Sequence, residues 1–289
     1  MKKLTALLMT GILALSVLAG CGSSGNASAA GASDEGAPGA QDATPGNKIT
    51  VAASATPHAE ILEQAKPLLK EKGYDLEVTI FDDYVQPNNV VESGEFDANY
   101  FQHIPYLNEF NEEQGTHLVN AGGIHYEPFG IYAGKKSDLS ELADGDEIAV
   151  PNDTTNEARA LLLLEANGVI TLKQGAGLTA TVNDIESYSK DIQIIELAAE
   201  SVKDAIPDAA FVVLNGNYAL EAGLSVGKDS LAYEAQDSEA AATYVNVIAV
   251  KDGNENDDKI QALVEVLKSD AIVDYINKTY DGAVVPYKN

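Results

Sequence analysis

Residues 48–81 read KITVAASATPHAEILEQAKPLLKEKGYDLEVTIF, and the spacing of their apolar residues indicates the fold class. Ile49 to Ala53 is a short apolar run typical of a buried strand. Thr56-Pro57 is a good N-cap and first-turn pair, and apolar residues then recur at helical spacing as far as Gly73. Leu76 to Phe81 alternates as a strand does. A strand, a helix and a second strand in this order predict a mainly parallel α/β sheet.

The same kinds of element recur towards the C-terminus. We expect a helix over Thr154–Asn167, helical stripes between Ile260 and Ile276, and strands over Glu147–Val150, Ile192–Leu197, Ala209–Leu214 and Tyr244–Val250. The folded part begins near Lys48 and contains about 240 residues, which suits two domains of ordinary size. The sequence therefore predicts two α/β lobes, and no stretch after Cys21 is long and apolar enough to cross a membrane.

The N-terminus has the layout of an export signal. Met1-Lys2-Lys3 is followed by an apolar run of about 14 residues and then by Leu18-Ala19-Gly20-Cys21. These four residues resemble the lipobox of bacterial lipoproteins, whose cysteine is acylated, and the alternative is a buried cysteine that ends a core helix. We expect residues 1–20 to be a signal peptide, Cys21 to carry lipid, and residues 21–47, which contain no large apolar side chain, to be a flexible tether. The protein would then be held at the outer face of the cytoplasmic membrane.

The charge balance restricts the partners. The chain has 45 acidic and 18 basic residues and a formal net charge of −27. Phosphate backbones and anionic lipids are bound by clustered Lys and Arg, so neither nucleic acid nor a basic membrane patch is expected. Membrane attachment would depend on the acyl chains alone. Cys21 is the single cysteine, which excludes an internal disulfide.

Several motifs of enzymes and metal sites are incomplete. The stretches 130–135 and 223–228 have three residues between their glycines, whereas a P-loop has four. The loop from Asp252 lacks the glycine and the final glutamate of a calcium loop. No G-x-S-x-G elbow occurs, and the four histidines have no metal-ligand spacing, although a site assembled from distant segments stays open. We expect no cofactor, no metal and no enzymatic activity.

Two features indicate a small-molecule site. Arg159 is the only arginine, and it lies just after the first turn of the helix that Thr154 and Glu157 would open as a capping box. A guanidinium there could grip a carboxylate at the ends of the strands, or it could form a surface ion pair. Aromatic residues gather in the stretches 82–87 and 97–106, where they could wall a pocket or pack the first lobe.

Four motifs together resemble the methionine-binding lipoproteins of the MetQ/NlpA family, which are the substrate-binding components of ABC importers. They are Asp-Tyr-Val-x-Pro-Asn at 83–88, Phe-Gln-His-x-Pro-Tyr at 101–106, Val-Pro-Asn-Asp at 150–153 leading to Arg159, and Tyr-Val-Asn at 244–246. The resemblance covers nearly all of Lys48 to Asn289. It implies a two-lobed periplasmic-binding-protein fold, type II-like, in which the chain crosses twice between the lobes. We place the crossings near 126–133 and 243–247, with lobe 1 over 48–127 plus 247–289 and lobe 2 over 128–246.

The resemblance also implies a site between the lobes. Arg159 would pair with the ligand carboxylate, Asn215 and Asn246 would bind its amino and carboxylate groups, and the methionine side chain would be surrounded by Tyr84, Phe101, His103 and Tyr106. His103 would be neutral. Read without the resemblance, Asn215 would be a helix cap and Asn246 an ordinary polar residue of a strand. The stretch Gly122–Pro128 does not match the family pattern, so ligand preference could differ if it lines the cleft.

The function implied is delivery of methionine to a membrane permease that a cytoplasmic ATPase drives. Alternatives within the same module are D-methionine, a methionine dipeptide or another apolar amino acid. Alternatives of another class are a lipid-anchored hydrolase, which would need a nucleophile and a base in the cleft, and a surface adhesin without a cleft.

Overall fold

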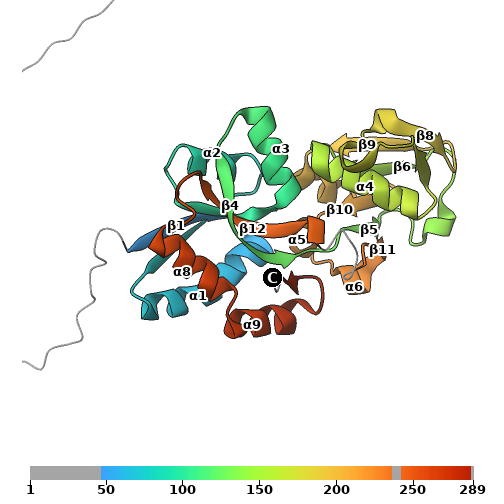
Figure 1. The fold of residues 1–289 in the computed structure, drawn as a ribbon. Coiled ribbons are helices and arrows are strands. Elements are labelled where there is room, and N and C mark those ends of the chain that lie inside the picture. The colour runs from blue at the N-terminus through green and yellow to red at the C-terminus, as the bar shows by residue number, and fades with distance from the viewer. Residues whose placement is uncertain (1–46, 236–241, 288–289) are drawn as a thin grey trace, which may run out of the picture. The chain divides into compact units, whose positions relative to one another are not determined.

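The computed structural model describes residues 47–235 and 242–287, which form two β-sheets with their covering helices (Figure 1). The predicted signal peptide, Cys21 and nearly all of the predicted tether lie outside the described residues. Within the described part, no helix combines the length and the apolar character needed to cross a membrane.

The first sheet has the strand order β13-β4-β12-β3-β1-β2. It contains β1 (Lys48–Ala53), β2 (Asp75–Ile80), β3 (Ala98–His103), β4 (Leu118–Tyr126), β12 (Val245–Lys251) and β13 (Val285–Pro286). β1 is parallel to β2 and β3, whereas β12 runs antiparallel to both of its neighbours. The C-terminal segment therefore returns to complete the N-terminal sheet.

Five helices accompany the first sheet. Figure 1 shows α1, α8 and α9 grouped at one side of it and α2 and α3 at another. Their bounds are α1 (Glu60–Glu71), α2 (Gln86–Glu92), α3 (Ile104–Gln114), α8 (Asp258–Leu267) and α9 (Asp270–Tyr280). The buried residues of α1, including Ile61, Leu62, Ala65 and Leu69, repeat at helical spacing and join the main hydrophobic core with those of α8 and α9.

The second sheet has the strand order β11-β5-β10-β6-β9. Its strands are β5 (Gly130–Ala133), β6 (Glu147–Pro151), β9 (Gln193–Leu197), β10 (Phe211–Leu214) and β11 (Ser230–Tyr233), and β7 (Ile170–Leu172) pairs with β8 (Ile185–Tyr188) in a separate hairpin. β6 is parallel to β9 and β10, and β5 runs antiparallel to β10. The helices α4 (Thr154–Ala166), α5 (Gly216–Glu221) and α6 (Val226–Asp229) belong to this part of the chain.

The chain passes between the sheets twice. Glu127, Pro128 and Phe129 join β4 to β5, and residues 234–244, of which 236–241 are not described, join β11 to β12. These two connections are called crossing 1 and crossing 2 below. Two sheets joined by two crossings agree with the two-lobed fold expected from sequence.

Some details of the sequence prediction are wrong. The sheets are mixed and not mainly parallel. In each sheet, the strand that follows a crossing runs antiparallel to both of its neighbours; this strand is β12 in the first sheet and β5 in the second. The first helix begins at Glu60 instead of Thr56, because residues 55–59 form a separate turn in which Thr56 has extended backbone angles. The helical stripes predicted near the C-terminus are confirmed, and they belong to two helices that are separated by Lys268 and Ser269.

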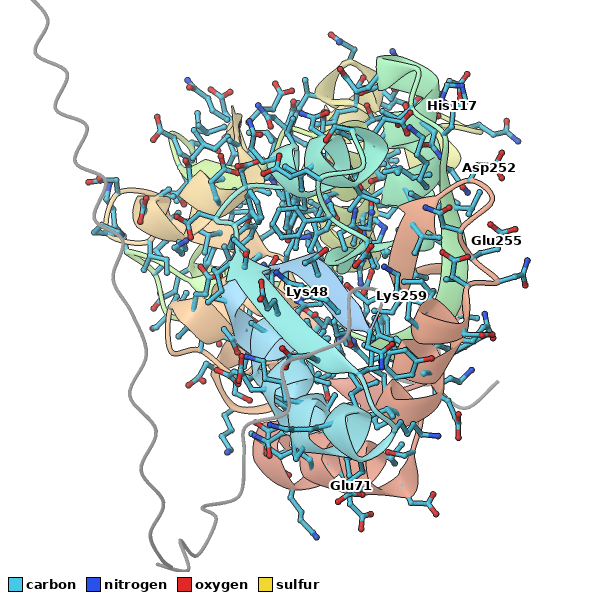
Figure 2. The ribbon with its side chains drawn as sticks, turned by 90° about the vertical axis from the view of Figure 1, so that its left-hand side faces the viewer. Lys48, Glu71, His117, Asp252, Glu255 and Lys259 are labelled. Atoms are coloured by element: carbon cyan, nitrogen blue, oxygen red, sulfur yellow. The ribbon has the colours of Figure 1, made fainter. Side chains whose placement is uncertain are left out.

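Charged side chains are spread over the periphery. Figure 2 shows Lys48, Glu71, His117, Asp252, Glu255 and Lys259 on the outside of the molecule, with acidic and basic groups interspersed. The stretch that partly matched a calcium loop is a turn between β12 and α8, where the main-chain N–H of Gly253 donates to Glu255.

Gly134 provides a test of the packing at the end of β5. A Cβ at this position would lie 2.4 Å from the carbonyl oxygen of Ala209 and 2.9 Å from that of Ala210, and main-chain atoms cannot swing aside. Gly134→Ala should therefore lower the free energy of unfolding by about 1–3 kcal/mol in urea titrations. Gly227→Ala is the matched control, because a Cβ at Gly227 would meet nothing within 4 Å. Equal stability of the two variants would contradict this packing.

Candidate functional site

A cavity of about 20 Å³ lies where residues from both sheets and from crossing 1 meet. Its lining includes all seven ligand-binding residues expected from the sequence, and five others, and consists of Tyr84, Phe101, Gln102, His103, Tyr106, Glu127, Asn156, Arg159, Asn215, Gly216, Asn217 and Asn246. The volume suits about one water molecule. A larger ligand can enter only if the groups that close the cavity move apart.

Aromatic rings form one wall. The Tyr84 ring centroid lies 5.6 Å from that of Phe101, 5.7 Å from that of Tyr106 and 5.0 Å from that of Tyr218. The loop that carries Tyr84 is held by Asp83, whose carboxylate accepts hydrogen bonds from two main-chain N–H groups that follow it. Tyr218 belongs to α5, which follows the second sheet's strand β10. The aromatic cluster, which the sequence placed in the first lobe alone, therefore contains a residue from each lobe.

Polar contacts join the two sides across this wall. The Tyr84 hydroxyl donates to Asn217 Oδ1 at 2.5 Å, and the Tyr218 hydroxyl donates to the carbonyl of Asp82 at 2.9 Å. In each of these two bonds, the donor and the acceptor lie more than 130 residues apart in the chain. These bonds hold the cavity in its narrow form.

His103 and Asn156 form a second link. The ring Nδ1 of His103 accepts from the main-chain N–H of Tyr106 at 3.1 Å and so caps α3, which leaves Nε2 to donate to Asn156 Oδ1 at 3.0 Å. Burial, together with the positive charge of Arg159, lowers the pKa of His103 to about 3. The ring is therefore neutral near pH 7, as the sequence-based interpretation expected.

Asn156 and its neighbours correct the predicted helix start. α4 is capped by Asp153, whose carboxylate accepts from the Asn156 main chain, and not by Thr154. Glu157, the other member of the predicted capping box, accepts instead from the main-chain N–H of Val182. Asn156 is thus free to turn its Oδ1 to His103 and to Asn215 Nδ2, which donates to it at 2.9 Å.

Two polar atoms in the lining have no partner among the described residues. Asn215 Oδ1 and Asn217 Nδ2 are buried, and neither makes a hydrogen bond. Asn215 occupies the N-cap position of α5, as the alternative reading of this residue expected, but its side chain makes no capping hydrogen bond. A buried acceptor and a buried donor without partners cost free energy that a polar ligand could recover.

Arg159 is buried and held by both crossings. Its Nε and Nη2 donate to the two carboxylate oxygens of Glu234, at 2.8 and 2.5 Å, and Nη2 also donates to the main-chain oxygen of Glu127 at 2.9 Å. The guanidinium carbon lies 4.1 Å from the ring centroid of Tyr244 and 4.8 Å from that of Phe129. The alternative reading of Arg159 as part of a surface ion pair is wrong, because the side chains of Arg159 and Glu234 are only 4% and 10% exposed.

Opposing effects act on the Glu234 carboxylate. Burial alone would raise its pKa, but the charge and hydrogen bonds of Arg159, with further donors from Tyr126 and the main chain of Phe129, hold the pKa below its ordinary value. Burial would likewise lower the pKa of Arg159, and Glu234 raises it. Each group keeps the other ionised.

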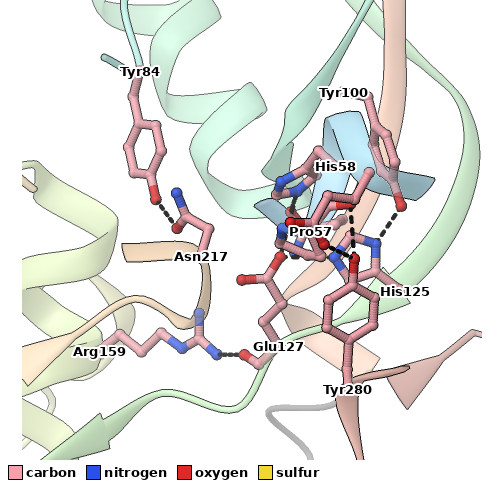
Figure 3. Close-up of polar contacts among 11 residues, drawn as sticks. Pro57, His58, Tyr84, Tyr100, His125, Glu127, Arg159, Asn217 and Tyr280 are labelled. Atoms are coloured by element: carbon pink, nitrogen blue, oxygen red, sulfur yellow. Dashed lines mark hydrogen bonds and ion pairs between the residues drawn. The ribbon is translucent and has the colours of Figure 1, made fainter. Parts of the chain in front are cut away.

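Behind the cavity lies a buried cluster of His58, His125 and Glu127 (Figure 3). His125 Nε2 is 2.7 Å and His58 Nε2 is 3.4 Å from Glu127 Oε1. Tyr100 hydrogen-bonds His125 Nδ1, and His58 Nε2 lies 3.0 Å from Asn246 Oδ1. The register of the sheet places Asn246 opposite His103 on one side and His125 on the other.

The cluster brings together two histidines that are 67 residues apart in the chain, which no local spacing could have revealed. Three potential metal-ligand atoms lie within 4.8 Å of one another. Burial lowers the pKa of His58 to about 4, against the effect of Glu127, and lowers that of His125 to about 3. Because His125 Nε2 hydrogen-bonds Glu127 and His58 Nε2 hydrogen-bonds Asn246, the arrangement is a hydrogen-bonded network.

The lining residues Gln102, Glu127, Asn156, Gly216 and Asn217 were missed in the sequence. Four of them lie close in the chain to residues that the sequence had identified. Gln102 precedes His103, Gly216 and Asn217 follow Asn215, and Asn156 lies three residues before Arg159. Glu127 lies in the unmatched stretch Gly122–Pro128, so that stretch does line the cavity. Neighbourhood in the chain was the only available signal.

The Glu234 carboxylate should be a major stabilising group. At pH 7, Glu234→Gln should lower the free energy of unfolding by about 3 kcal/mol, because it leaves the Arg159 charge buried without a counter-ion. Since the folded pKa of Glu234 lies below its ordinary value of 4.5, the stabilisation is present above that pH and is lost as the pH falls through the folded value. In urea titrations, the difference in the free energy of unfolding between wild type and variant should therefore be smaller at pH 4 than at pH 7.

Glu265→Gln is the control for this prediction. Glu265 pairs with Lys72 at 3.0 Å, but its side chain is 70% exposed, so the variant should lose less than about 1 kcal/mol. Similar losses in the two variants would contradict the assigned importance of the buried pair.

Comparison with known proteins places these observations in a family context. The sequence profile described as NlpA lipoprotein matches residues 49–288. The methionine-binding lipoprotein MetQ of Bacillus subtilis is 44% identical over 245 residues, which are 83% of this chain and 88% of that protein. The D-methionine-binding lipoprotein MetQ of Escherichia coli is 37% identical over 248 residues, covering 85% of this chain and 90% of that one.

Solved structures agree with the sequence relatives. A lipoprotein from Ruminococcus gnavus has 71% identity and a TM-score of 0.83 over 84% of this chain and 100% of its own. A nutrient-binding protein from Burkholderia cenocepacia bound to methionine has 39% identity and a TM-score of 0.79, over 83% and 100%. A periplasmic substrate-binding protein of an ABC transporter from Coxiella burnetii has 37% identity and a TM-score of 0.78, also over 83% and 100%.

Proposed function

Because the chain belongs to the NlpA lipoprotein family, we propose that it is the substrate-binding lipoprotein of an ABC importer and that it binds methionine between its two lobes. The observation that carries the proposal is the cavity itself, in which an aromatic wall faces a polar end with unpartnered hydrogen-bonding atoms. The family consists of substrate-binding proteins, and we propose that this chain likewise catalyses no reaction.

The two ends of the cavity suit the two ends of methionine. A thioether makes favourable contacts with aromatic edges, worth about 0.3 to 1.5 kcal/mol, and each buried methylene adds about 0.8 kcal/mol. Tyr84, Phe101 and Tyr106 supply those edges. In the proposed complex the side chain of methionine lies against them and its charged groups face Asn215 and Arg159.

Arg159 can contribute only part of its guanidinium. Nε and Nη2 are already held by Glu234 and by the Glu127 carbonyl, and the described residues give Nη1 no hydrogen bond. We propose that Nη1 is the nitrogen that donates to the ligand carboxylate, with Asn217 Nδ2 as the neighbouring donor. The sequence led us to expect that Arg159 alone would bind the carboxylate through two N–H groups. In the proposed complex, Arg159 and Asn217 each supply one donor.

Binding would proceed through lobe closure. The narrow cavity requires the contacts Tyr84–Asn217 and Tyr218–Asp82 to separate before a ligand enters, and crossings 1 and 2 are the segments about which the lobes can turn. A ligand that touches both sides favours the closed state by its additional contacts there. The lobe bounds that we propose are 48–127 plus 245–289 and 128–244, because Val245 and Asn246, which the sequence assigned to lobe 2, lie in β12 of the first sheet.

We also propose that Cys21 carries the lipid and anchors the protein at the outer face of the cytoplasmic membrane. A tether of about 26 residues would then let the binding domain reach a permease and its cytoplasmic ATPase without diffusing away. The support is the lipoprotein family together with the lipobox-like sequence.

The proposal predicts direct binding of L-methionine. Calorimetry on the full chain in detergent should show a one-site binding isotherm, and saturating methionine should raise the melting temperature, since the ligand binds only the folded state. D-methionine, a methionine dipeptide and leucine form the comparison panel. If methionine produces neither heat nor a thermal shift, methionine is not the ligand.

Asn215 should contribute to affinity through its unpartnered oxygen. Asn215→Ala should weaken methionine binding at least about tenfold, because a hydrogen bond to a charged group contributes about 1.5 to 3 kcal/mol. Asn254→Ala, in the exposed turn after β12, is the matched control and should bind as wild type does. Undiminished binding by Asn215→Ala would remove this residue from the site.

A further inference from the structure

Glu127 is a buried carboxylate that lines the cavity. Its side chain is only 6% exposed, and it lies in crossing 1. Figure 3 shows one carboxylate oxygen turned towards His58 and His125, and the other turned away from them, towards the side on which Asn217 and Arg159 lie. One oxygen is therefore anchored, and the other faces the ligand side.

The surroundings hold this carboxylate in place. His125 Nε2 donates to it at 2.7 Å, and the main-chain N–H of Asn217 also donates to it. A Cβ on residue 216 would lie 2.6 Å from Glu127 Oε2, so only glycine allows the first turn of α5 to approach so closely. The group is oriented before any ligand arrives.

The charge of Glu127 lacks a matching cation among the described residues. The nearby guanidinium of Arg159 is paired bidentately with Glu234, and it reaches Glu127 only at the main-chain oxygen. His58 and His125, which touch the carboxylate, are neutral near pH 7. Burying an ionised carboxylate without a counter-ion is costly, and burial accordingly raises the pKa of Glu127, although His58 and Arg159 oppose this effect.

We propose that Glu127 is the counter-charge for the α-ammonium group of the ligand, so that the cavity selects ligands with a free α-ammonium. An ammonium group has three N–H donors, and the ligand side of the cavity offers it Glu127 and the unpartnered Asn215 Oδ1 as acceptors. The ligand thereby supplies the positive charge that the protein omits. The inference rests on the proposed function, since it assigns a residue to the same site.

The two histidines serve this role as neutral supports. Tyr100 hydrogen-bonds His125 Nδ1, which turns the N–H of His125 Nε2 towards Glu127. His58 shares its Nε2 between Asn246 Oδ1 at 3.0 Å and Glu127 Oε1 at 3.4 Å. They orient the carboxylate without neutralising it, and its charge is left for the ligand.

The test compares two ligands on two proteins. Glu127→Gln keeps the shape of the side chain and removes its charge. In calorimetry on the full chain in detergent, this variant should bind L-methionine about 10- to 100-fold more weakly than wild type does. Its affinity for 4-(methylthio)butanoic acid, which keeps the side chain and carboxylate of methionine but lacks the amino group, should not fall, because this anion gains nothing from the charge of Glu127 and is repelled by it.

A matched control comes from the second lobe. Glu157 is also buried, but it accepts a hydrogen bond from Val182 and does not line the cavity, so Glu157→Gln should not discriminate between the two ligands. If Glu127→Gln fails to fold, Glu127→Asp retains the charge. It should preserve the preference of wild type for methionine over the desamino analogue.

The outcomes separate this inference from the proposed function. Equal weakening of both ligands by Glu127→Gln, no weakening of either, or equal affinity of wild type for both would overturn the role of Glu127 while methionine remained the ligand. If wild type binds another α-amino acid in place of methionine, the proposed ligand is wrong. The same comparison, made with that amino acid and its desamino counterpart, then decides the role of Glu127. If no ligand with an α-ammonium binds, both are overturned.

Discussion

The buried ion pair between Arg159 and Glu234 is the interaction on which the rest of the site depends. It joins α4 to crossing 2, and through the carbonyl of Glu127 the same guanidinium also holds crossing 1. The aromatic rings stacked around it, those of Phe129 and Tyr244, belong to the crossings as well. A single cation thus holds both of the chain segments that connect the lobes.

This pair also sets the electrostatic character of the cavity. Because Glu234 neutralises Arg159, the guanidinium brings little net charge to a ligand and acts mainly through a directed N–H donor. The three buried histidines near the cavity are neutral near pH 7, with pKa values lowered to about 3 or 4. In the role proposed for it, Glu127 supplies the remaining charge of the cavity. A zwitterion with an apolar side chain matches this arrangement better than an anion does, since an anion would face an uncompensated carboxylate.

The sequence predicted those features that local patterns encode. Strand β1, helix α4 and the aromatic cluster follow from hydrophobic spacing, and resemblance to a family selected Asn215 and Asn246, which composition alone would not have distinguished. The antiparallel insertion of β5 and β12, the pairing of Arg159 with a residue 75 positions away, and the meeting of His58 with Glu127 could not be predicted. Each depends on the path of the chain through the two crossings, and no local pattern encodes that path.

The placement of Glu127 connects recognition with motion. It lies on crossing 1, Asn246 lies at the start of β12 just beyond crossing 2, and Asn215 and Arg159 lie on the second lobe. In the proposed complex the ligand ammonium contacts Glu127, and the ligand carboxylate contacts Arg159. The ligand then touches crossing 1, about which the lobes turn, and the second lobe, which closure brings nearer to it. Only contacts that differ between the open and closed states can shift the equilibrium between them. Contacts with the crossing itself change little on closure. In the proposed complex, closure is therefore driven by the ligand contacts of Arg159 and Asn215, and Glu127 selects the ligands that are held.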